Sequence, residues 1–378
     1  MPHHAVPSFR IGISGSYGGL NLGDEAILEV ILAGLRAAVK AEVTVFSRNV
    51  EDTRRRHDVD RVVAVRDLTR QEVSPEVERL DLLILGGGGI LFDAEAEIVL
   101  REAQIAFEKD VPVLVYAVSV GPLDDANARK LVRDALGRAT VVTVRDRQSR
   151  KLLEQIGVAR DVRLTADPAL LLQPAPVSDE AFEAEGLASG RRTIGISVRE
   201  RGAAAPDLDE GRYHQLLANA ADYLVDRLDA DLLFFPLERN VLDLQQSHAV
   251  ISHMAYPQRA HVLKGEYGSG ELLSLIGRLE FAVGMRLHFL IFSAIQRVPF
   301  VALPYSGKVS GFIEDLEMRL PAVQEMRAGQ LIAYLDRSWD FREELRAQID
   351  RHLPGLQQRA SETTGIAVEL LQRRGGGR

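Results

Sequence analysis

The chain has 378 residues, more than one ordinary hydrophobic core accommodates, which predicts two domains. Hydrophobic residues make up 46% and charged residues 26%, as in a typical globular protein, and the net charge of −8 argues against general nucleic-acid binding. The absence of cysteine excludes disulfides, thiolate nucleophiles and cysteine-ligated metals. No apolar run reaches the ~18 residues of a transmembrane helix, and residues 1–7 lack the pattern of a secretion signal. We therefore expect a cytoplasmic protein without a transmembrane segment.

Short apolar segments alternate with amphipathic segments through the first half of the chain. This alternation predicts parallel βαβ units and a doubly wound α/β sheet. The expected strands are Arg10–Ser14, Glu42–Phe46, Arg61–Val65, Leu80–Leu85, Pro112–Tyr116 and Ala139–Val144. The expected helices lie near Asp24–Ala38, Ala94–Lys109, Asp124–Gly137 and Arg147–Ile156.

The alternation stops at Gln173–Gly190, which is predicted to link two lobes, and then resumes. The sequence thus predicts an N-terminal Rossmann-like lobe at 1–175, a C-terminal Rossmann-like lobe at 190–327, and helices at 328–378 that return to the first lobe. We expect those helices to be interrupted at Pro354 and the glycine-rich end to be disordered. The expected strands of the second lobe are Thr193–Val198, Asp231–Phe235, Ala260–Leu263, Glu280–Gly284 and Phe300–Leu303, and the expected helices lie near Glu210–Leu228, Val241–Met254, Gly270–Arg278, Leu287–Ile295 and Ser310–Glu317.

Glycine-rich segments follow two strands of the first lobe. Residues 15–25 contain four glycines, and Gly86–Gly89 follow the strand Leu80–Leu85 and are closed by Asp93. Glycines allow close approach of the backbone to a ligand, and the helix that begins near Asp24 offers free N–H groups to an anion. The glycine spacing does not match a dinucleotide-binding fingerprint. The alternative interpretation of the first segment is a tight strand–helix turn with Asp24 as N-cap.

Four side chains suited to bind or protonate an anion follow predicted strands. Arg145 ends a strand of the first lobe, whereas Arg286 and His288 end a strand of the second. Lys308, one of only six lysines, lies in a predicted loop after the last strand. Carboxyl ends of parallel strands meet at one sheet edge, so we expect these residues to face one anion. The alternatives are a surface ion pair for Arg145 and a packing role for His288.

Six segments in order resemble the polysaccharide pyruvyl transferase family, particularly its bacterial cell-wall branch. The resemblance runs from residue 11 to about residue 320 and therefore covers most of the chain. One departure is Ser306-Gly307, where we expect an acidic or polar residue before Lys308. The matching segments are Tyr17–Ile27, Gly86–Asp93, Val144–Asp146, Thr165–Ala169, Gly284–His288, and Pro304–Lys308 with Gly311-Phe312.

The resemblance implies a GT-B-like fold with an active site in the cleft between the lobes. It implies transfer of the pyruvyl group of phosphoenolpyruvate, a co-substrate, onto two sugar hydroxyls of a cell-wall or exopolysaccharide glycan, which gives a cyclic ketal and phosphate. His288 would be the general acid, and Arg145, Arg286 and Lys308 would bind the donor, because Arg suits both its phosphate and its carboxylate. The acceptor, free or lipid-linked at the membrane surface, would contact the first lobe at Asn21, Asp24, Glu25, Gly87, Gly88 and Asp93.

Two other functions fit the same architecture. One is a nucleotide-sugar-dependent glycosyltransferase, which would favour a paired-glutamate motif before the Val298-Pro299 segment. Glu317 and Glu325 have a suitable gap but follow that segment. The other is a non-catalytic glycan- or anion-binding protein, since fold alone does not imply turnover. No His, Asp or Glu cluster has metal-ligand spacing, so the sequence predicts neither a metal nor a bound cofactor.

Overall fold

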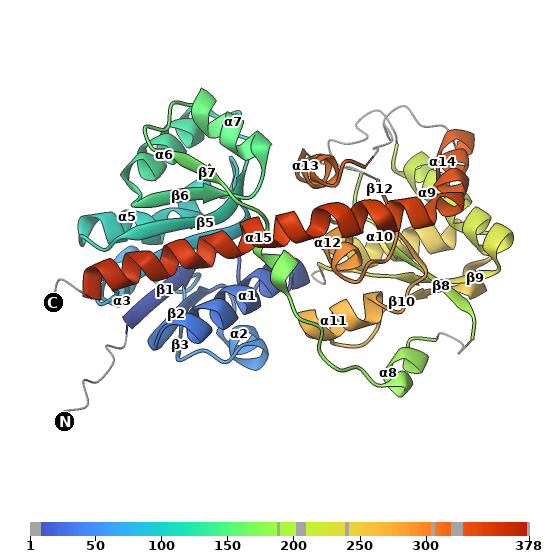
Figure 1. The fold of residues 1–378 in the computed structure, drawn as a ribbon, viewed down its shortest axis with the longest axis horizontal. Coiled ribbons are helices and arrows are strands. Elements are labelled where there is room, and N and C mark those ends of the chain that lie inside the picture. The colour runs from blue at the N-terminus through green and yellow to red at the C-terminus, as the bar shows by residue number, and fades with distance from the viewer. Residues whose placement is uncertain are drawn as a thin grey trace. The chain divides into compact units, whose positions relative to one another are not determined.

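The computed structural model describes residues 9–186, 190–201, 209–238, 242–303, 307–318 and 328–375. Contacts divide the chain into two compact units. Of the described residues, unit 1 holds 9–20, 24–172 and 356–375, and unit 2 holds 21–23 and those of 173–355. Each unit is built on its own parallel sheet (Figure 1). Among the described residues, no helix is both long enough and apolar enough to cross a lipid bilayer.

Unit 1 contains a seven-stranded sheet in the order β3-β2-β1-β4-β5-β6-β7, in which every neighbouring pair is parallel. The order reverses direction between β1 and β4, as in a doubly wound sheet. The strands are β1 (Phe9–Ser14), β2 (Ala41–Ser47), β3 (Arg61–Ala64), β4 (Leu82–Leu91), β5 (Val113–Val120), β6 (Val141–Val144) and β7 (Val162–Leu164). The helices are α1 (Leu22–Ala38), α2 (Val50–Arg56), α3 (Arg70–Glu78), α4 (Ala96–Val99), α5 (Arg101–Glu108), α6 (Ala126–Arg138), α7 (Arg147–Gln155) and the short 3-10 helix η1 (Pro168–Leu171).

Local sequence explains why these elements begin where they do. All eight residues of β5 are buried, as expected for a valine-rich central strand covered on both faces. Asp146 caps α7 by accepting a hydrogen bond from the Ser149 backbone N–H at 2.7 Å. A capping box between Thr69 and Glu72 starts helix α3. Helices α2 and α3 and strand β7 were not predicted from the sequence.

The glycine run lies inside β4 rather than after it, which corrects the predicted end of that strand at Leu85. Gly86 and Gly88 have φ of 120° and 86°, a region that side chains other than glycine rarely adopt. A Cβ atom on Gly87 would lie 2.4 Å from Ile27 Cγ2 of α1, and one on Gly86 would lie 2.9 Å from the Tyr116 carbonyl oxygen. Helix α1 and strand β5 therefore pack directly on the glycine backbone.

Unit 2 contains a five-stranded parallel sheet in the order β10-β9-β8-β11-β12, which reverses between β8 and β11. The strands are β8 (Arg192–Ser197), β9 (Ala230–Phe234), β10 (Ala260–Val262), β11 (Phe281–Gly284) and β12 (Phe300–Ala302), each within two residues of its predicted position. The helices are α8 (Asp179–Ala184), α9 (Glu210–Leu228), α10 (Leu242–Ser252), α11 (Ser269–Ile276), α12 (Leu287–Ile295), α13 (Gly307–Asp315) and the 3-10 helix η3 (Pro257–Arg259). Helix α8 lies within the segment that was predicted to be a linker.

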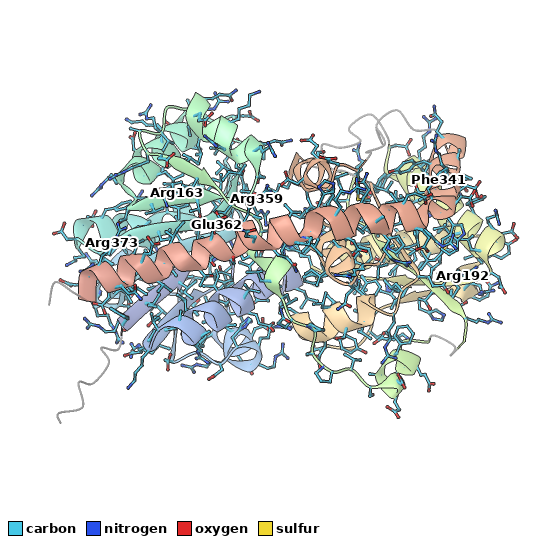
Figure 2. All side chains as sticks on the ribbon, in the orientation of Figure 1. Arg163, Arg192, Phe341, Arg359, Glu362 and Arg373 are labelled. Carbon is cyan, nitrogen blue, oxygen red and sulfur yellow. The ribbon has the colours of Figure 1, made fainter. Side chains whose placement is uncertain are left out.

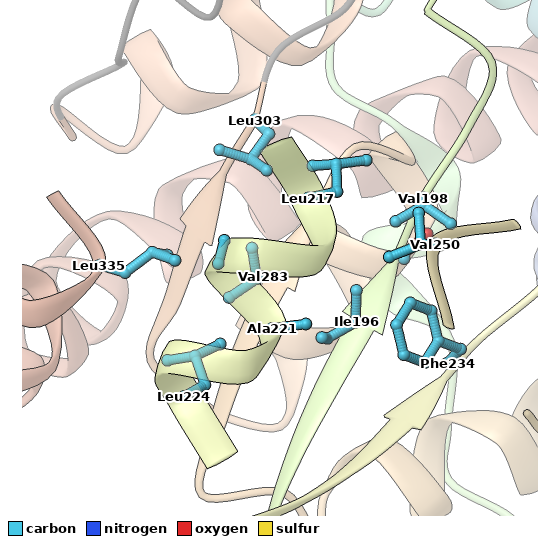
Figure 3. A pocket seen from close by; sticks show the side chains of 12 residues that line it. Ile196, Val198, Leu217, Ala221, Leu224, Phe234, Val250, Val283, Leu303 and Leu335 are labelled. Atoms are coloured by element: carbon cyan, nitrogen blue, oxygen red, sulfur yellow. The ribbon is translucent and has the colours of Figure 1, made fainter. Parts of the chain in front are cut away.

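An apolar pocket lies in unit 2 between α9 and the sheet (Figure 3). Leu217 and Leu224 of α9 line one side, and Ile196, Phe234 and Val283 of the strands line the other. Apart from the Ser197 hydroxyl, the side chains that line the pocket are apolar, and none carries a charge. The pocket is therefore a feature of the hydrophobic core and does not fit a phosphorylated substrate.

Two helices, α14 (Ala328–Asp340) and α15 (Arg342–Gly375), end the described chain. Helix α15 continues through Pro354, so the predicted interruption there is wrong. The missing N–H at Pro354 costs one helical hydrogen bond, but Ile349, Leu353 and Leu356 are buried around it and hold the helix in place. From Leu356 onward α15 belongs to unit 1, where Thr364 Oγ1 lies 2.7 Å from the Tyr116 hydroxyl.

Candidate active site

The candidate site of unit 2 lies at the carboxyl end of β11. In doubly wound sheets, ligands bind outside the carboxyl ends of the strands where the strand order reverses. Strands β8 and β11 flank that reversal, and Met285, Arg286 and His288 follow β11 directly. Two of the predicted site residues, Arg286 and His288, therefore occupy the position at which this fold presents side chains to a ligand.

Arg286 is the N-cap residue of α12, and two carboxylates hold its guanidinium group. Its Nε donates to both Asp243 oxygens, at 3.0 and 2.9 Å, and its Nη2 also contacts Asp243 Oδ1. The same Nη2 donates to Glu238 Oε2 at 2.7 Å. The Arg286 side chain is only 9% exposed, so these contacts fix its orientation.

Asp243 is fully buried in the first turn of α10. Burial raises the pKa of its carboxyl above the usual range, and the Arg286 guanidinium opposes that shift. Its Oδ2 also accepts a hydrogen bond from the Glu238 backbone N–H at 3.0 Å. Neither Asp243 nor Glu238 was predicted from the sequence.

Residues 21–23, counted with unit 2, form a short turn beside His288. Asn21 forms an antiparallel β-bridge with Glu238, and the Leu22 N–H donates to the Leu237 carbonyl at 2.9 Å. The Asn21 side chain accepts from the Gly23 N–H at 3.0 Å. This turn starts α1 at Leu22, so Asp24 lies inside the helix and is not its N-cap, as the alternative interpretation of this segment had it.

His288 packs against the backbone of Gly23. A Cβ atom built on Gly23 would lie 1.9 Å from His288 Nδ1 and 2.3 Å from its Cγ, so only glycine fits there. The ring is half-buried on the first turn of α12, and its centroid lies 6.4 Å from that of Phe292. The structure therefore brings the predicted residues His288 and Asn21 into one cluster with Arg286, Asp243 and Glu238.

Replacing Gly23 with alanine will displace His288 and lower the free energy of unfolding by about 1–3 kcal/mol, because an inserted methyl group overpacks a filled site. The variant will also be less active, since the His288 imidazole can no longer occupy its position. Gly365→Ala is the matched control: this glycine lies in α15 with open space around its Cβ direction. The control will leave activity unchanged and raise stability by about 0.5–1 kcal/mol. Thermal melting and turnover measured on both variants check the prediction, and equal behaviour of the two would contradict it.

Lys308 lies on α13, which corrects its prediction as a loop residue. The helix begins at Gly307, close after the carboxyl end of β12, and the lysine is half-buried. Residues 304–306, part of the predicted lysine loop, lie outside the described residues. Lys308 shares unit 2 with Arg286, and its contact with the donor stays a prediction.

Arg145 is a buried residue of unit 1 with a carboxylate partner of its own. Its Nη1 lies 2.5 Å from Asp167 Oδ2, and its Nε donates to Ser119 Oγ at 2.6 Å. Ser119 in turn donates to Asp146 at 2.5 Å. This network joins the ends of β5 and β6 to the segment before η1. The structure thus gives Arg145 a structural role, and its expected participation in donor binding stays a prediction.

The glycine-rich segment after β1 is held by buried polar contacts inside unit 1. Glu25 accepts from the Gly18 N–H at 2.9 Å, and its other oxygen lies 2.8 Å from His57 Nε2. The Tyr17 hydroxyl donates to the Gly86 carbonyl. Burial, reinforced by the nearby Asp24 and Glu25 carboxylates, raises the Tyr17 pKa well above its usual value. Glu25 therefore fixes the shape of this segment from within.

The other predicted contacts of unit 1 also have internal partners. Asp24 is buried, and its Oδ1 would lie 2.9 Å from a Cβ atom on Gly88. Asp93 accepts hydrogen bonds from the backbone N–H groups of Asp124 at 2.9 Å and Asp125 at 3.1 Å. The close packing of α1 accounts for the presence of glycine at positions 87 and 88 without a bound ligand. The contact of Gly87 and Gly88 with an acceptor therefore stays a prediction. No group of three or more metal-binding side chains occurs among the described residues.

The sequence model of one enzyme family, described as polysaccharide pyruvyl transferase, matches residues 21–307, well over half of the chain. The protein belongs to the polysaccharide pyruvyl transferase family. The match begins at the Asn21 turn and extends past Arg286 and His288, so it spans the whole cluster in unit 2. A member of this family is an enzyme, and the protein is accordingly a glycan-modifying transferase.

Comparisons with individual proteins agree with the family. The amylovoran biosynthesis protein AmsJ of Erwinia amylovora is 21% identical over 294 residues, which cover 74% of this chain and 71% of AmsJ. UDP-GlcNAc 2-epimerase from Neisseria meningitidis, bound to UDP-GlcNAc, is similar with a TM-score of 0.65 at 12% identity, covering 96% of this chain and 99% of that one. TcCGT1 in complex with UDP gives a TM-score of 0.61 at 11% identity, covering 97% and 100%. The structural similarities confirm the predicted fold of two Rossmann-like lobes, which is of the GT-B type.

Proposed function

We propose that this pyruvyl transferase takes the pyruvyl group from phosphoenolpyruvate and joins it to two hydroxyls of one glycan sugar. The proposal is carried by the position of Arg286 and His288, which follow β11 at the strand-order reversal of unit 2 in a chain of this family. Phosphoenolpyruvate bears a phosphate and a carboxylate, which require a fixed cation. It also bears a vinyl carbon, which requires a proton donor.

The proposed reaction needs one proton delivered to carbon. His288 protonates the methylene carbon, the enol double bond is consumed, and C2 becomes an oxocarbenium centre. One sugar hydroxyl adds to C2 and loses its proton. Phosphate then leaves with the electrons of its C–O bond, and the second hydroxyl adds to C2 and loses its proton, which closes the ketal. An imidazole titrates near neutral pH and therefore suits the first step.

Arg286 has the geometry to orient the donor in this scheme. Asp243 holds its guanidinium from one side in a largely buried setting, so the group cannot rotate freely. A guanidinium fixed in this way presents its remaining donors in one plane to a carboxylate or phosphate. Lys308 on α13 would add a second positive charge from the neighbouring strand end.

Incubation with phosphoenolpyruvate and a panel of polysaccharide sugars tests the proposal. Phosphate release that depends on the acceptor, together with a product that carries a pyruvyl ketal by mass spectrometry, is expected. The competing function is a glycosyltransferase that uses a nucleotide sugar. Release of nucleoside diphosphate from UDP-sugars, with no phosphate released from phosphoenolpyruvate, would replace the proposal with that function.

We also propose that the acceptor is lipid-linked and reached at an anionic membrane surface. Ten basic and four acidic residues lie between residues 126 and 163, a net charge of +6 in a chain whose total is −8. Side chains of α6 and α7 extend outward from unit 1 (Figure 2). The exposed basic residues of this segment are Arg129, Lys130, Arg138, Arg147, Arg150, Lys151, Arg160 and Arg163.

Binding to vesicles that contain phosphatidylglycerol will be sensitive to salt and will weaken at least about tenfold in the double variant Lys130→Glu, Lys151→Glu. Each basic residue near such a surface contributes roughly 1 kcal/mol to the free energy of membrane binding. The two Lys→Glu substitutions together change the charge by four units in the unfavourable direction. Lys264→Glu, an exposed lysine of unit 2, serves as the control and will bind as the wild type does. Sedimentation of protein with vesicles measures the difference. Equal binding of the double variant and the control would show that the acceptor is met elsewhere.

A further inference from the structure

The two carboxylates on Arg286 occupy different environments. Asp243 is 0% exposed, both of its oxygens contact the guanidinium, and one also accepts the Glu238 backbone N–H. The Glu238 side chain is 32% exposed and contacts the guanidinium through Oε2 at 2.7 Å. An ion pair that is partly exposed to water is weak, whereas breaking a buried one is costly. Asp243 is therefore the permanent partner and Glu238 the exchangeable one.

The charge balance of this cluster opposes an anionic ligand while Glu238 stays in place. One guanidinium and two carboxylates sum to a net charge of −1. The Glu238 Oε2 also accepts a hydrogen bond from Nη2 at 2.7 Å, and of the two carboxylates Glu238 is the partly exposed one. Without the Glu238 carboxylate, the charges of Arg286 and Asp243 sum to zero, and Nη2 can donate to a donor carboxylate or phosphate instead.

The backbone allows the Glu238 side chain to leave without disturbing the rest of the site. Its N–H stays bound to Asp243 Oδ2, and its β-bridge to Asn21 holds the peptide in place. Only side-chain torsions need to change. The exchange is thus a local event with a small free-energy cost.

We propose that Glu238 is a displaceable counter-ion of the donor site. In the enzyme without a donor it pairs with Arg286, and an incoming donor anion takes its place on Nη2. When the product phosphate has formed, the returning carboxylate competes with it and promotes its release. Asp243 acts as a positioning residue that keeps the guanidinium oriented throughout. This inference rests on the proposed function of Arg286 as a donor-binding residue.

The variant Glu238→Gln tests this role because it keeps the size and a hydrogen-bonding oxygen but removes the competing charge. Calorimetric titration of the full-chain Glu238→Gln variant with inorganic phosphate alone is expected to give a Kd about 3–10-fold lower than the Kd of the wild type. The KM for phosphoenolpyruvate and the inhibition constant of phosphate are expected to fall in parallel. A residue that served only to support the fold would raise these constants or leave them unchanged.

Glu280→Gln is the matched control. Glu280 also pairs with an arginine of unit 2, Arg192, at 2.8 Å and with half of its side chain exposed, but it precedes β11 instead of following it. Its phosphate Kd is expected to equal that of the wild type. If Glu238→Gln does not fold, Glu238→Asp retracts the carboxylate from Arg286 and is expected to change the phosphate Kd in the same direction, by less.

Failure of this inference is distinguishable from failure of the proposed function. If wild-type enzyme releases phosphate from phosphoenolpyruvate while Glu238→Gln binds inorganic phosphate no more tightly, the counter-ion role is overturned and the function stands. If no acceptor supports phosphate release but Glu238→Gln still binds inorganic phosphate more tightly, the counter-ion role stands and the donor is another anion.

Discussion

Replacing His288 with alanine will lower the rate of acceptor-dependent phosphate release by about 10² to 10⁴, the range typical of a lost general acid. The imidazole lies at the carboxyl end of β11, where the fold presents side chains to ligands. Donor binding will change little because Arg286 remains held by Asp243. His288→Gln, which keeps polarity and much of the volume, will lose activity to a similar extent because an amide cannot deliver the proton.

Paired melting curves separate catalysis from packing for this residue. His248→Ala is the control, since that histidine is exposed on α10 of the same unit, and it will keep both activity and melting temperature. His288→Gln is expected to melt near the wild type. A His288 variant that melts several degrees lower yet turns over normally would assign the residue a packing role and remove it from the mechanism.

Replacing Asp243 with alanine will lower the free energy of unfolding by about 3 kcal/mol, because removing one partner of a buried ion pair leaves the other insufficiently compensated. Glu238 still contacts Arg286 but is partly exposed, so it offsets only part of the loss. The same variant will bind phosphoenolpyruvate more weakly, since the guanidinium loses its fixed orientation. Asp243→Asn retains an acceptor oxygen and will lose less stability than Asp243→Ala.

Urea denaturation followed by a signal from unit 2 measures this loss. Glu280→Ala removes an arginine partner of comparable distance that is half exposed, and it will cost less than about 1 kcal/mol. A loss for Asp243→Ala no larger than that of Glu280→Ala would show that burial adds nothing to the Arg286 pair.

The strands were largely predictable because parallel strands buried on both faces consist of continuous apolar runs. Eleven strands were expected, and each corresponds to a strand of the structure. The edge strand β7 was missed because it has only three residues and alternates buried with exposed positions. Helices α2 and α3 were missed because they are short and polar, and their capping residues Asn49 and Thr69 carry most of the signal.

The candidate site was only partly predictable. Arg286 and His288 were found because unusual side chains directly after a buried strand are visible in the sequence. Asp243 was missed because it shares a polar face of α10 with Gln246 and Ser247, and a polar helix face usually faces water. In this protein that face is buried. Ion pairs between residues 43 positions apart, such as Arg286 with Asp243, follow from the tertiary fold and have no local signal.

The assignment of residues 356–375 to unit 1 has a consequence for how the protein is made. Unit 1 begins with the first strand of the chain, but its Tyr116 hydroxyl pairs with Thr364 and its Leu170 carbonyl with Gln357. These partners are synthesised after all of unit 2. The surface of unit 1 that α15 covers therefore stays exposed while nearly two hundred further residues are synthesised. A nascent chain stalled before residue 356 would expose the apolar surface that α15 covers, and would be a substrate for chaperones.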